Sequence, residues 1–380
     1  MEYKKLVVYA TIIILAALIT LFTFDTWQTV LLTTLLLLSL SYLVILSMDR
    51  LTTINYGTIK EGFVTSSEEL EEQDTHVSDA LVSEASTSKY EWLGNDDLFD
   101  DFYASVFTKL TQNETLVQAE TGICLEEFLR TTSKDPAVGE SHSAYSHAKR
   151  AMDQLRILDA GCGIGVGTCS FAKQGVGHTT GIDKSPAIIR YAKGTTVPST
   201  TLTDIQQQNL EFRLADLNGP GAAGAAEFTD ACLLYFTVYY FRDLDMLFRN
   251  LALWVKPGGH LAIEVVNKYK FDPVLNPSNP WIGISPQKYA KERITKSKVV
   301  FDTFEYDAVF ELEDPNAEFR ETFRFKDGSV RRQKHKLIMP SISTIVKKAT
   351  QNGWTYTKYV DLMPLSFQYG YLLFFTRNTE

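Results

Sequence analysis

Hydrophobic residues change their spacing several times along this chain. Two uncharged runs, 6–24 and 29–48, are each long enough to cross a hydrocarbon core of about 30 Å as a helix. A cleaved signal peptide is the alternative for the first run, but that run exceeds a usual signal core and a second span follows it. Acidic residues with Ser and Thr then dominate as far as Glu91, without an apolar period. The pattern predicts a transmembrane helical hairpin over 1–50 and an acidic flexible linker over 51–90.

The charges that flank the two runs predict their orientation. Lys4 and Lys5 precede the first run, Arg50 and Lys60 follow the second, and the connecting loop has no positive charge. Because positive charge favours the cytoplasmic side, both ends of the hairpin should face the cytosol. We therefore expect an integral membrane protein that holds everything after the linker on the cytosolic face of the membrane.

After the linker the spacing becomes helical and then alternates between two periods. Apolar residues from Phe99 to Leu110 fall on one face of a helix, within a segment 91–150 that we expect to be a helical N-terminal cap. Over 151–266 predicted strands and helices alternate, which favours a parallel sheet with crossover helices and hence a doubly wound α/β core. The expected strands are 156–160, 178–182, 210–214, 230–235 and 260–266, and the expected helices are 166–174, 186–193 and 244–255.

The segment 267–339 interrupts this alternation. Apolar and polar residues alternate from Thr303 to Leu312, and Asp327–Gly328 is a hairpin turn signal, so we predict an antiparallel β insertion. The final segment, 340–380, returns to one helix and two strands and is expected to complete the α/β core.

Charge and cysteine content narrow the classes of function. The 380 residues carry a formal net charge of -9, so a broad basic surface for nucleic-acid phosphates is not expected. The one dense basic run, Arg331–Lys336, is interpreted as a solvated strand edge. The four cysteines form no zinc or disulfide pattern, so buried apolar roles in a reduced compartment fit them, and no metal cluster is visible in the sequence.

Three glycines alternate with other residues after the first predicted strand of the α/β core. Gly161, Gly163 and Gly165 follow the acidic Asp159 and precede a predicted helix. Glycine allows backbone to approach a ligand closely, and the helix N-terminus beside it carries partial positive charge. Asp183 ends the next predicted strand, where a carboxylate can accept hydrogen bonds from ribose hydroxyls. The arrangement therefore indicates a site for a ligand that contains a ribose.

The run 157–165 resembles the first motif of class I S-adenosylmethionine-dependent methyltransferases, and 181–183 resembles the second. The match covers about 156–266, and 256–259 also resembles the turn before the family's fifth strand. The resemblance implies a doubly wound, Rossmann-like methyltransferase sheet and S-adenosyl-L-methionine as the cofactor.

The same resemblance implies roles for particular residues. An acid at the position of Asp159 engages the methionine end of the cofactor, the glycines wrap that end, Asp183 holds the ribose, and Asp216 matches the position that accepts from the adenine amine. The full set of expected cofactor-binding residues is Asp159, Gly161, Cys162, Gly163, Gly165, Asp183, Lys184, Asp216 and Leu217.

Two other functions fit parts of the pattern. A nicotinamide- or flavin-dependent dehydrogenase would need a small residue where this chain has Val166 or Thr168, so its fingerprint fits less well. A catalytically inactive, methyltransferase-fold membrane scaffold is the second alternative. The presence of Asp159, Asp183 and Asp216 together counts against it.

The acceptor is less well defined than the cofactor. We expect a small-molecule, lipid or protein acceptor and consider nucleic acid unlikely, because no Asn-Pro-Pro-Tyr motif follows the strand 230–235. Phe236, Tyr239 and Tyr240 follow that strand and are candidates to face the acceptor, with core packing as an equal alternative. No general base is assigned from the sequence.

Three further expectations concern histidines and the insertion. His260, at the start of a strand, is expected to be structural. His335, in the insertion, is expected not to face the pocket, and a position facing the pocket is the alternative. The insertion leaves the carboxyl end of the strand 260–266, which lies at the ligand edge of the sheet, so we expect it to act as a substrate lid.

Overall fold

The structure is a computed structural model of the chain. It describes residues 56–57, 92–111, 114–132, 151–275, 287 and 290–379. The predicted hairpin over 1–50, and the predicted linker over 51–90 apart from residues 56–57, lie outside the described residues. The described residues all belong to one compact unit, 56–380.

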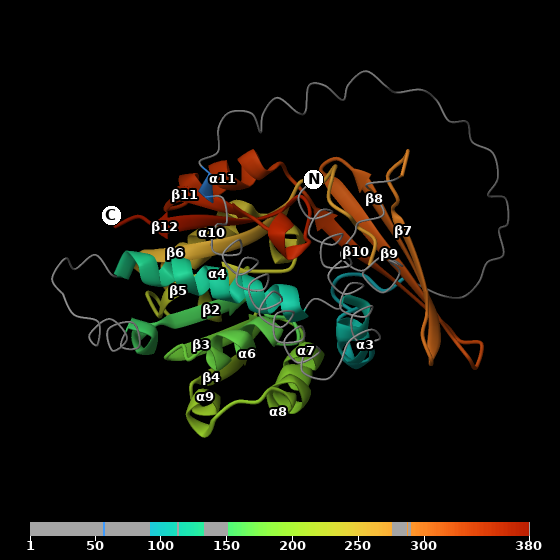
Figure 1. Cartoon of the computed structure of the whole chain (residues 1–380), viewed down its shortest axis with the longest axis horizontal. Coiled ribbons are helices and arrows are strands. Elements are labelled where there is room, and N and C mark those ends of the chain that lie inside the picture. Colours follow the sequence, from blue (N-terminus) through green and yellow to red (C-terminus); the bar gives the residue numbers. More distant parts are fainter. Residues whose placement is uncertain are drawn as a thin grey trace, which may run out of the picture. The chain divides into compact units, whose positions relative to one another are not determined.

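Five parallel strands form the centre of an eight-stranded sheet (Figure 1). They are β2 (Arg156–Ala160), β3 (His178–Asp183), β4 (Leu210–Leu214), β5 (Phe228–Leu233) and β6 (Val255–Val266), and they lie side by side in the order β6-β5-β2-β3-β4. Each neighbouring pair among them is parallel. The strand order reverses beside β2, so the carboxyl end of this strand opens onto the crevice where ligands bind in such sheets.

Three antiparallel strands extend this sheet beyond β6. β12 (Gly370–Arg377) pairs with β6, β11 (Trp354–Asp361) pairs with β12, and the two-residue β1 (Tyr56–Gly57) pairs with β11. The predicted mixed α/β class is therefore confirmed. The strand β1 falls within the segment that the sequence predicts to be a flexible linker.

Helices cover both faces of the sheet, with α4 and α6 in front of it and α10 behind it in Figure 1. The helices are α3 (Asp101–Thr111), α4 (Glu114–Thr132), α6 (Val166–Lys173), α7 (Pro186–Tyr191), α8 (Val197–Ser199), α9 (Asp204–Gln208), α10 (Leu244–Trp254) and α11 (Ile342–Gln351), with a π-helical turn η3 (Ala192–Thr196) and 3-10 turns η4 (Pro220–Ala222), η5 (Thr237–Tyr240) and η8 (Met363–Leu365). Several begin at side-chain caps, as short polar residues favour. The caps are Ser185 on Ile188 N, Thr203 on Gln206 N, Asp243 on Met246 N and Ser341 on Thr344 N.

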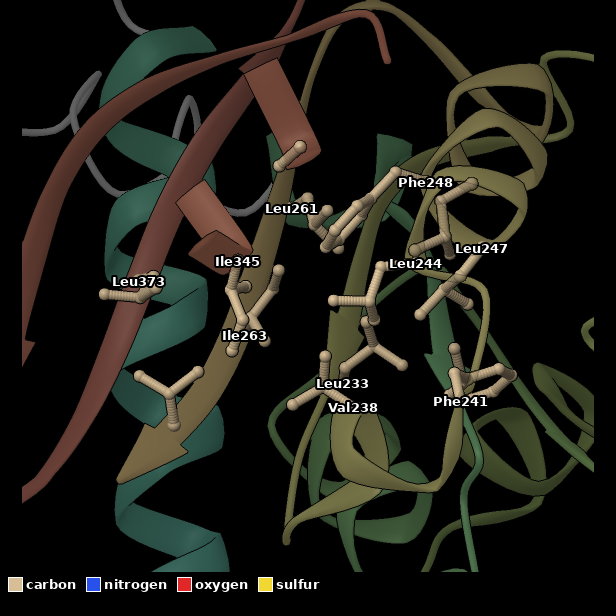
Figure 2. Packing of buried hydrophobic residues seen from close by; sticks show 14 of the residues in the cluster. Leu233, Val238, Phe241, Leu244, Leu247, Phe248, Leu261, Ile263, Ile345 and Leu373 are labelled. Carbon is tan, nitrogen blue, oxygen red and sulfur yellow. The ribbon is translucent and has the colours of Figure 1, made fainter. Parts of the chain in front are cut away.

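The main core lies between the sheet and the pair α10 and α11 (Figure 2). Leu233 of β5 and Ile263 of β6 meet Leu247 of α10 and Ile345 of α11, and all four side chains are fully buried. Burying each such side chain stabilises the fold by about 1.5–3 kcal/mol. This packing holds the carboxyl ends of β5 and β6 in fixed positions.

A separate four-stranded antiparallel sheet follows β6 in the chain. It has the order β10-β9-β8-β7 and consists of β7 (Lys296–Val300), β8 (Phe304–Glu313), β9 (Asn316–Phe325) and β10 (Val330–Ile338). Helix α3 packs on it through a cluster that includes Tyr103 and Val106 of α3 with Tyr306 and Phe323 of the sheet. We refer to β7–β10 as the second sheet.

The predicted localisation needs correction. Among the helices of the described ranges, none is both long and apolar enough to cross a membrane. Helix α4 has the required length, at 19 residues, but its sequence includes Glu114, Glu120, Glu126 and Arg130. This finding contradicts the prediction of an integral membrane protein with its catalytic domain on the cytosolic face, and that prediction is not carried further. The runs 6–24 and 29–48, from which it was made, lie outside the described residues.

Candidate functional site

The three alternating glycines form a tight turn between β2 and α6. Gly161, Gly163 and Gly165 have φ angles of 72°, 51° and 85°, a region that residues with a side chain rarely adopt. Gly165 is the N-cap residue of α6, so the turn leads directly into the positive end of a helix. The chain thus places a bend of free backbone at the carboxyl end of β2.

The glycines differ in what surrounds them. A Cβ atom at Gly161 would lie 2.4 Å from Cγ2 of Thr237, and one at Gly165 would lie 2.6 Å from Cζ of Phe212. At Gly163 a Cβ atom would have no heavy atom within 4 Å among the described residues, its two chain neighbours aside. Gly161 and Gly165 are therefore required by packing inside the protein, whereas open space adjoins Gly163. Among the three glycines, the middle one is thus the one beside which a side chain would find free space.

Asp183 lies at the end of β3 and braces the glycine turn. Its Oδ2 accepts a hydrogen bond from the backbone N–H of Gly163 at 3.1 Å, and its Oδ1 accepts from Ser185 N at 2.9 Å. Burial raises the pKa of this carboxyl, although the backbone donors act in the opposite direction. Each carboxylate oxygen has a second lone pair, so the group keeps capacity for ribose hydroxyls.

Both carboxylate oxygens of Asp159 accept hydrogen bonds from other side chains of the protein. It is buried, its Oδ2 accepts from the Thr168 hydroxyl at 2.7 Å, and its Oδ1 accepts from the Cys232 thiol at 3.8 Å. Burial raises its pKa from 3.8 to about 6, against the lowering effect of these donors. These bonds tie β2 to α6 and β5, so Asp159 has a structural role in addition to the cofactor contact that remains a prediction.

The other predicted cofactor residues follow the carboxyl ends of the parallel strands, and they differ in how exposed they are. Asp216 is exposed, and its Oδ1 accepts from the backbone and side-chain nitrogens of Asn218, both at 2.9 Å. Leu217 and Cys162 are buried among apolar neighbours. Lys184 forms an ion pair with Asp96 at 2.6 Å, in which both side chains are largely exposed.

The loop after β5 approaches the glycine turn from the other side. Tyr235 and Phe236 have φ angles of 50° and 61°, so two successive residues with side chains are held in the left-handed region. Such strain persists where surrounding contacts enforce it and is common at functional sites. Here Oε2 of Glu264 on β6 accepts from Tyr235 N at 2.6 Å and holds the bend.

The three candidate acceptor residues separate into two groups. Tyr239 is fully buried in the core, and its hydroxyl accepts a hydrogen bond from Val266 N at 2.9 Å. Core packing therefore accounts for it, and we do not retain it as an acceptor contact. Phe236 and Tyr240 are partly exposed and remain candidates. The ring of Phe236 lies 5.5 Å from that of Phe271, at the start of the predicted insertion.

The structure agrees with the expectation for His260 but not with that for the basic run 331–336. His260 is buried, its Nδ1 lies 2.6 Å from Oδ1 of Asp230, and its ring stacks on Phe128, which agrees with a structural role. His335 and Gln333 of the basic run are buried as well. The interpretation of this run as a solvated strand edge is wrong for these two residues, because α3 and the segment before it cover that face of β10.

Three buried carboxyls, those of Glu120, Glu264 and Glu321, escaped the sequence analysis. Glu321 of β9 lies beside His335, and Glu120 of α4 lies beside Glu264 under the loop after β5. Burial, followed by the charge of Glu264, raises the pKa of Glu120 well above its usual range. Alternation within β9 and β10 puts Glu321 and His335 on inward-facing positions, which is the one signal in the sequence that could have indicated them.

Comparison with known proteins agrees with the glycine turn and the carboxylates. The family model described as a methyltransferase domain matches residues 158–263. A phosphoethanolamine N-methyltransferase of Triticum aestivum is 30% identical over 131 residues, which cover 33% of this chain and 24% of that protein. A ubiquinone biosynthesis O-methyltransferase of Xylella fastidiosa is 30% identical over 124 residues, which cover 33% of this chain and 47% of that protein.

A solved structure of an S-adenosylmethionine-dependent methyltransferase from Clostridium acetobutylicum is also similar. It has 15% identity and a TM-score of 0.45, and the alignment covers 67% of this chain and 99% of that one. The chain matches only about a quarter to a half of the length of the two curated relatives. The predicted family and its cofactor, S-adenosylmethionine, are confirmed for the matched segment.

Proposed function

Residues 158–263 form a class I S-adenosylmethionine-dependent methyltransferase domain, and from this premise we propose that the chain transfers a methyl group to a small-molecule acceptor at the carboxyl edge of the parallel sheet. The observation that carries the proposal is the open space beside Gly163, bordered by the carboxylate of Asp183. Bare backbone, a helix N-terminus and an acid at the position expected to bind the ribose meet at this point.

When bound, the cofactor supplies a methyl group on a positively charged sulfur. The residues of the chain hold and orient the reactants, and such positioning can provide much of the acceleration of a methyl transfer. Gly163 and Asp183 would hold the cofactor, with Asp216 near its adenine end. Phe236 and Tyr240, on the strained loop after β5, would border the acceptor and exclude water from it.

The position of the second sheet supports the proposal that the acceptor is enclosed. It contacts the loop after β5 through Tyr240, whose hydroxyl lies 2.6 Å from Nδ1 of His335 on β10. We propose that the segment 267–339 covers the acceptor, as the sequence suggests. An acceptor held under such a cover is more easily a small molecule than a folded protein, and the relative from Triticum aestivum is named for a small molecule, phosphoethanolamine.

Calorimetry with the full-length chain tests the proposal. We expect binding of S-adenosylmethionine and S-adenosylhomocysteine, and we expect Asp183→Ala to weaken it, since hydrogen bonds to a charged group contribute about 1.5–3 kcal/mol each. Asp327→Ala, which removes a carboxylate from the exposed hairpin turn of the second sheet, is the matched control and should bind normally. Absence of binding at millimolar cofactor, or binding of a nicotinamide cofactor instead, would refute the proposal.

A further inference from the structure

A buried polar cluster joins the loop after β5 to the second sheet. His335 of β10 lies at its centre, with Nδ1 2.6 Å from the hydroxyl of Tyr240 and Nε2 2.7 Å from Oε2 of Glu321. The hydroxyl of Tyr103, on α3, lies 3.2 Å from the same Nε2. His335 and Glu321 are 4% and 1% exposed, so water does not compete for these bonds.

The hydrogen-bond partners of Glu321 indicate which ring nitrogen of His335 carries a proton. The Tyr306 hydroxyl donates to Oε1 of Glu321 and the Gln333 amide donates to Oε2, both at 2.6 Å. Burial acts to raise the pKa of Glu321, but the charge and hydrogen bond of His335 and these two donors outweigh it, so the pKa lies below its usual range. An ionised carboxylate only accepts, so Nε2 carries a proton toward Glu321. Whenever the ring gives up its second proton, Nδ1 becomes the acceptor that faces Tyr240.

With the His335 ring in its neutral form, Tyr240 donates its phenolic hydrogen to Nδ1. Of the three residues Tyr240, His335 and Glu321, only Tyr240 is partly exposed, and it ends the loop that follows β5. Burial raises its pKa well above 10, followed by the charges of Glu321, Tyr235 and Asp183. Thr237, the first residue of the same 3-10 turn, donates to Gly161 O at 3.3 Å, so this turn adjoins the expected cofactor edge. The raised pKa keeps the Tyr240 hydroxyl protonated and able to pass a proton on.

We propose that Tyr240, His335 and Glu321 form a proton relay that removes the proton of the methyl acceptor, and that the acceptor therefore carries a dissociable proton on its nucleophilic atom, as a hydroxyl or an ammonium does. This inference rests on the proposed function. Tyr240 is the catalytic residue that contacts the acceptor, and His335 and Glu321 act through it. No motif in the sequence assigns this role.

The step balances without any further reactant. For a hydroxyl acceptor, a bond forms between its oxygen and the methyl carbon while the bond from that carbon to sulfur breaks, and the sulfur keeps the electron pair as a neutral thioether. The acceptor proton passes to the oxygen of Tyr240 as the phenolic proton of Tyr240 moves to Nδ1 of His335. The resulting imidazolium is stabilised by the carboxylate of Glu321, as in other nucleophile, histidine and carboxylate arrangements.

A test that needs no turnover examines the tautomer of His335. In full-length protein with nitrogen-15 labelled histidine, nuclear magnetic resonance over a series of pH values should show that the neutral form of His335, which the relay uses, carries its proton on Nε2. His335→Gln identifies the signals by their loss. Tyr240→Phe should shift the Nδ1 resonance and leave the Nε2 proton in place, while Tyr356→Phe, which removes a hydroxyl without a hydrogen-bond partner in the described part of the chain, should shift neither. A neutral His335 ring with its proton on Nδ1, or no shift with Tyr240→Phe, would overturn the proposal.

A second test compares two acceptors of similar shape but different acidity, phenol and 4-nitrophenol. At a pH at which phenol is protonated and 4-nitrophenol is ionised, we expect Tyr240→Phe and His335→Gln to lower kcat on phenol by about 100-fold. On 4-nitrophenol, which has no proton to lose, the same variants should stay within a few-fold of wild type, with cofactor affinity unchanged. The loss on phenol should diminish as the pH rises and the acceptor ionises by itself.

The outcomes separate this inference from the proposed function. Equal losses on both phenols, together with unchanged pH dependence, would show that the cluster only docks the second sheet. If the wild type does not bind S-adenosylmethionine, the proposed function fails, whatever the tautomer of His335. If the cofactor binds but neither phenol is methylated, the tautomer measurement alone decides whether the relay is assembled as proposed.

Discussion

Alanine substitutions at Gly161 and Gly163 should differ in whether they mainly affect folding or cofactor binding, although both residues lie in one turn. Both have positive φ angles, so each alanine costs roughly 1–2 kcal/mol of folding free energy through backbone strain. At Gly161 the new methyl group would also lie 2.4 Å from Cγ2 of Thr237, and such overpacking adds about 1–3 kcal/mol. We therefore expect Gly161→Ala to lower the free energy of unfolding by roughly 2–5 kcal/mol.

Gly163→Ala should cost only the backbone strain but impair cofactor binding more strongly. Its methyl group would project into the space that adjoins the turn, where no heavy atom of the described residues lies within 4 Å apart from its chain neighbours. Urea unfolding measures the first effect and calorimetry with S-adenosylmethionine measures the second, under conditions in which both variants are folded.

A double variant isolates the packing part of the Gly161 effect. Thr237→Ser removes Cγ2 and keeps the hydroxyl that donates to Leu234 O at 2.6 Å. Gly161→Ala combined with Thr237→Ser should recover the overpacking part, about 1–3 kcal/mol, and retain the strain. If Gly163→Ala proves as destabilising as Gly161→Ala, or if Thr237→Ser recovers nothing, the packing argument is wrong.

Three further predictions concern the same region. Burial raises the pKa of Asp159 from 3.8 to about 6, so the folded protein binds the carboxyl proton more tightly than the unfolded chain does. The stability that this proton contributes should be full below about pH 4 and lost as the pH rises to about 6. Urea unfolding at a series of pH values should show this loss in the wild type and not in Asp159→Asn. Lys184→Ala should change the free energy of unfolding by less than about 1 kcal/mol, because its ion pair with Asp96 is exposed; a larger drop would contradict this estimate. Ser185→Ala should lower the free energy of unfolding by about 1–3 kcal/mol, because it removes both the cap on Ile188 N and the hydrogen bond to Phe99 O, whereas Ser185→Thr should retain most of it.

Local patterns in the sequence predicted much of the α/β core. The hydrophobic runs that became β2, β3 and β4 were placed within a residue of their observed bounds, and Ser185 was recognised as the cap of α7. These features depend on residues adjacent in the chain, so spacing and capping chemistry suffice to indicate them. The resemblance of the glycine turn to a methyltransferase motif likewise depends on contiguous residues, and it is sufficient to indicate the cofactor.

The functions of single residues depended on contacts between distant segments. Gly161 must be glycine because Thr237 packs against it, and Tyr239 belongs to the core because its hydroxyl meets the end of β6. Neither contact leaves a trace in the local sequence.

The basic run at 331–336 shows this difference most clearly. By itself the sequence indicated a strand with polar side chains, because alternation is a local property. Only the tertiary structure determined that α3 covers one face of that strand, which buries His335 between Glu321 and Tyr240. A buried histidine needs partners for both ring nitrogens, and only the packing of β9, β10 and the loop after β5 brings those partners together.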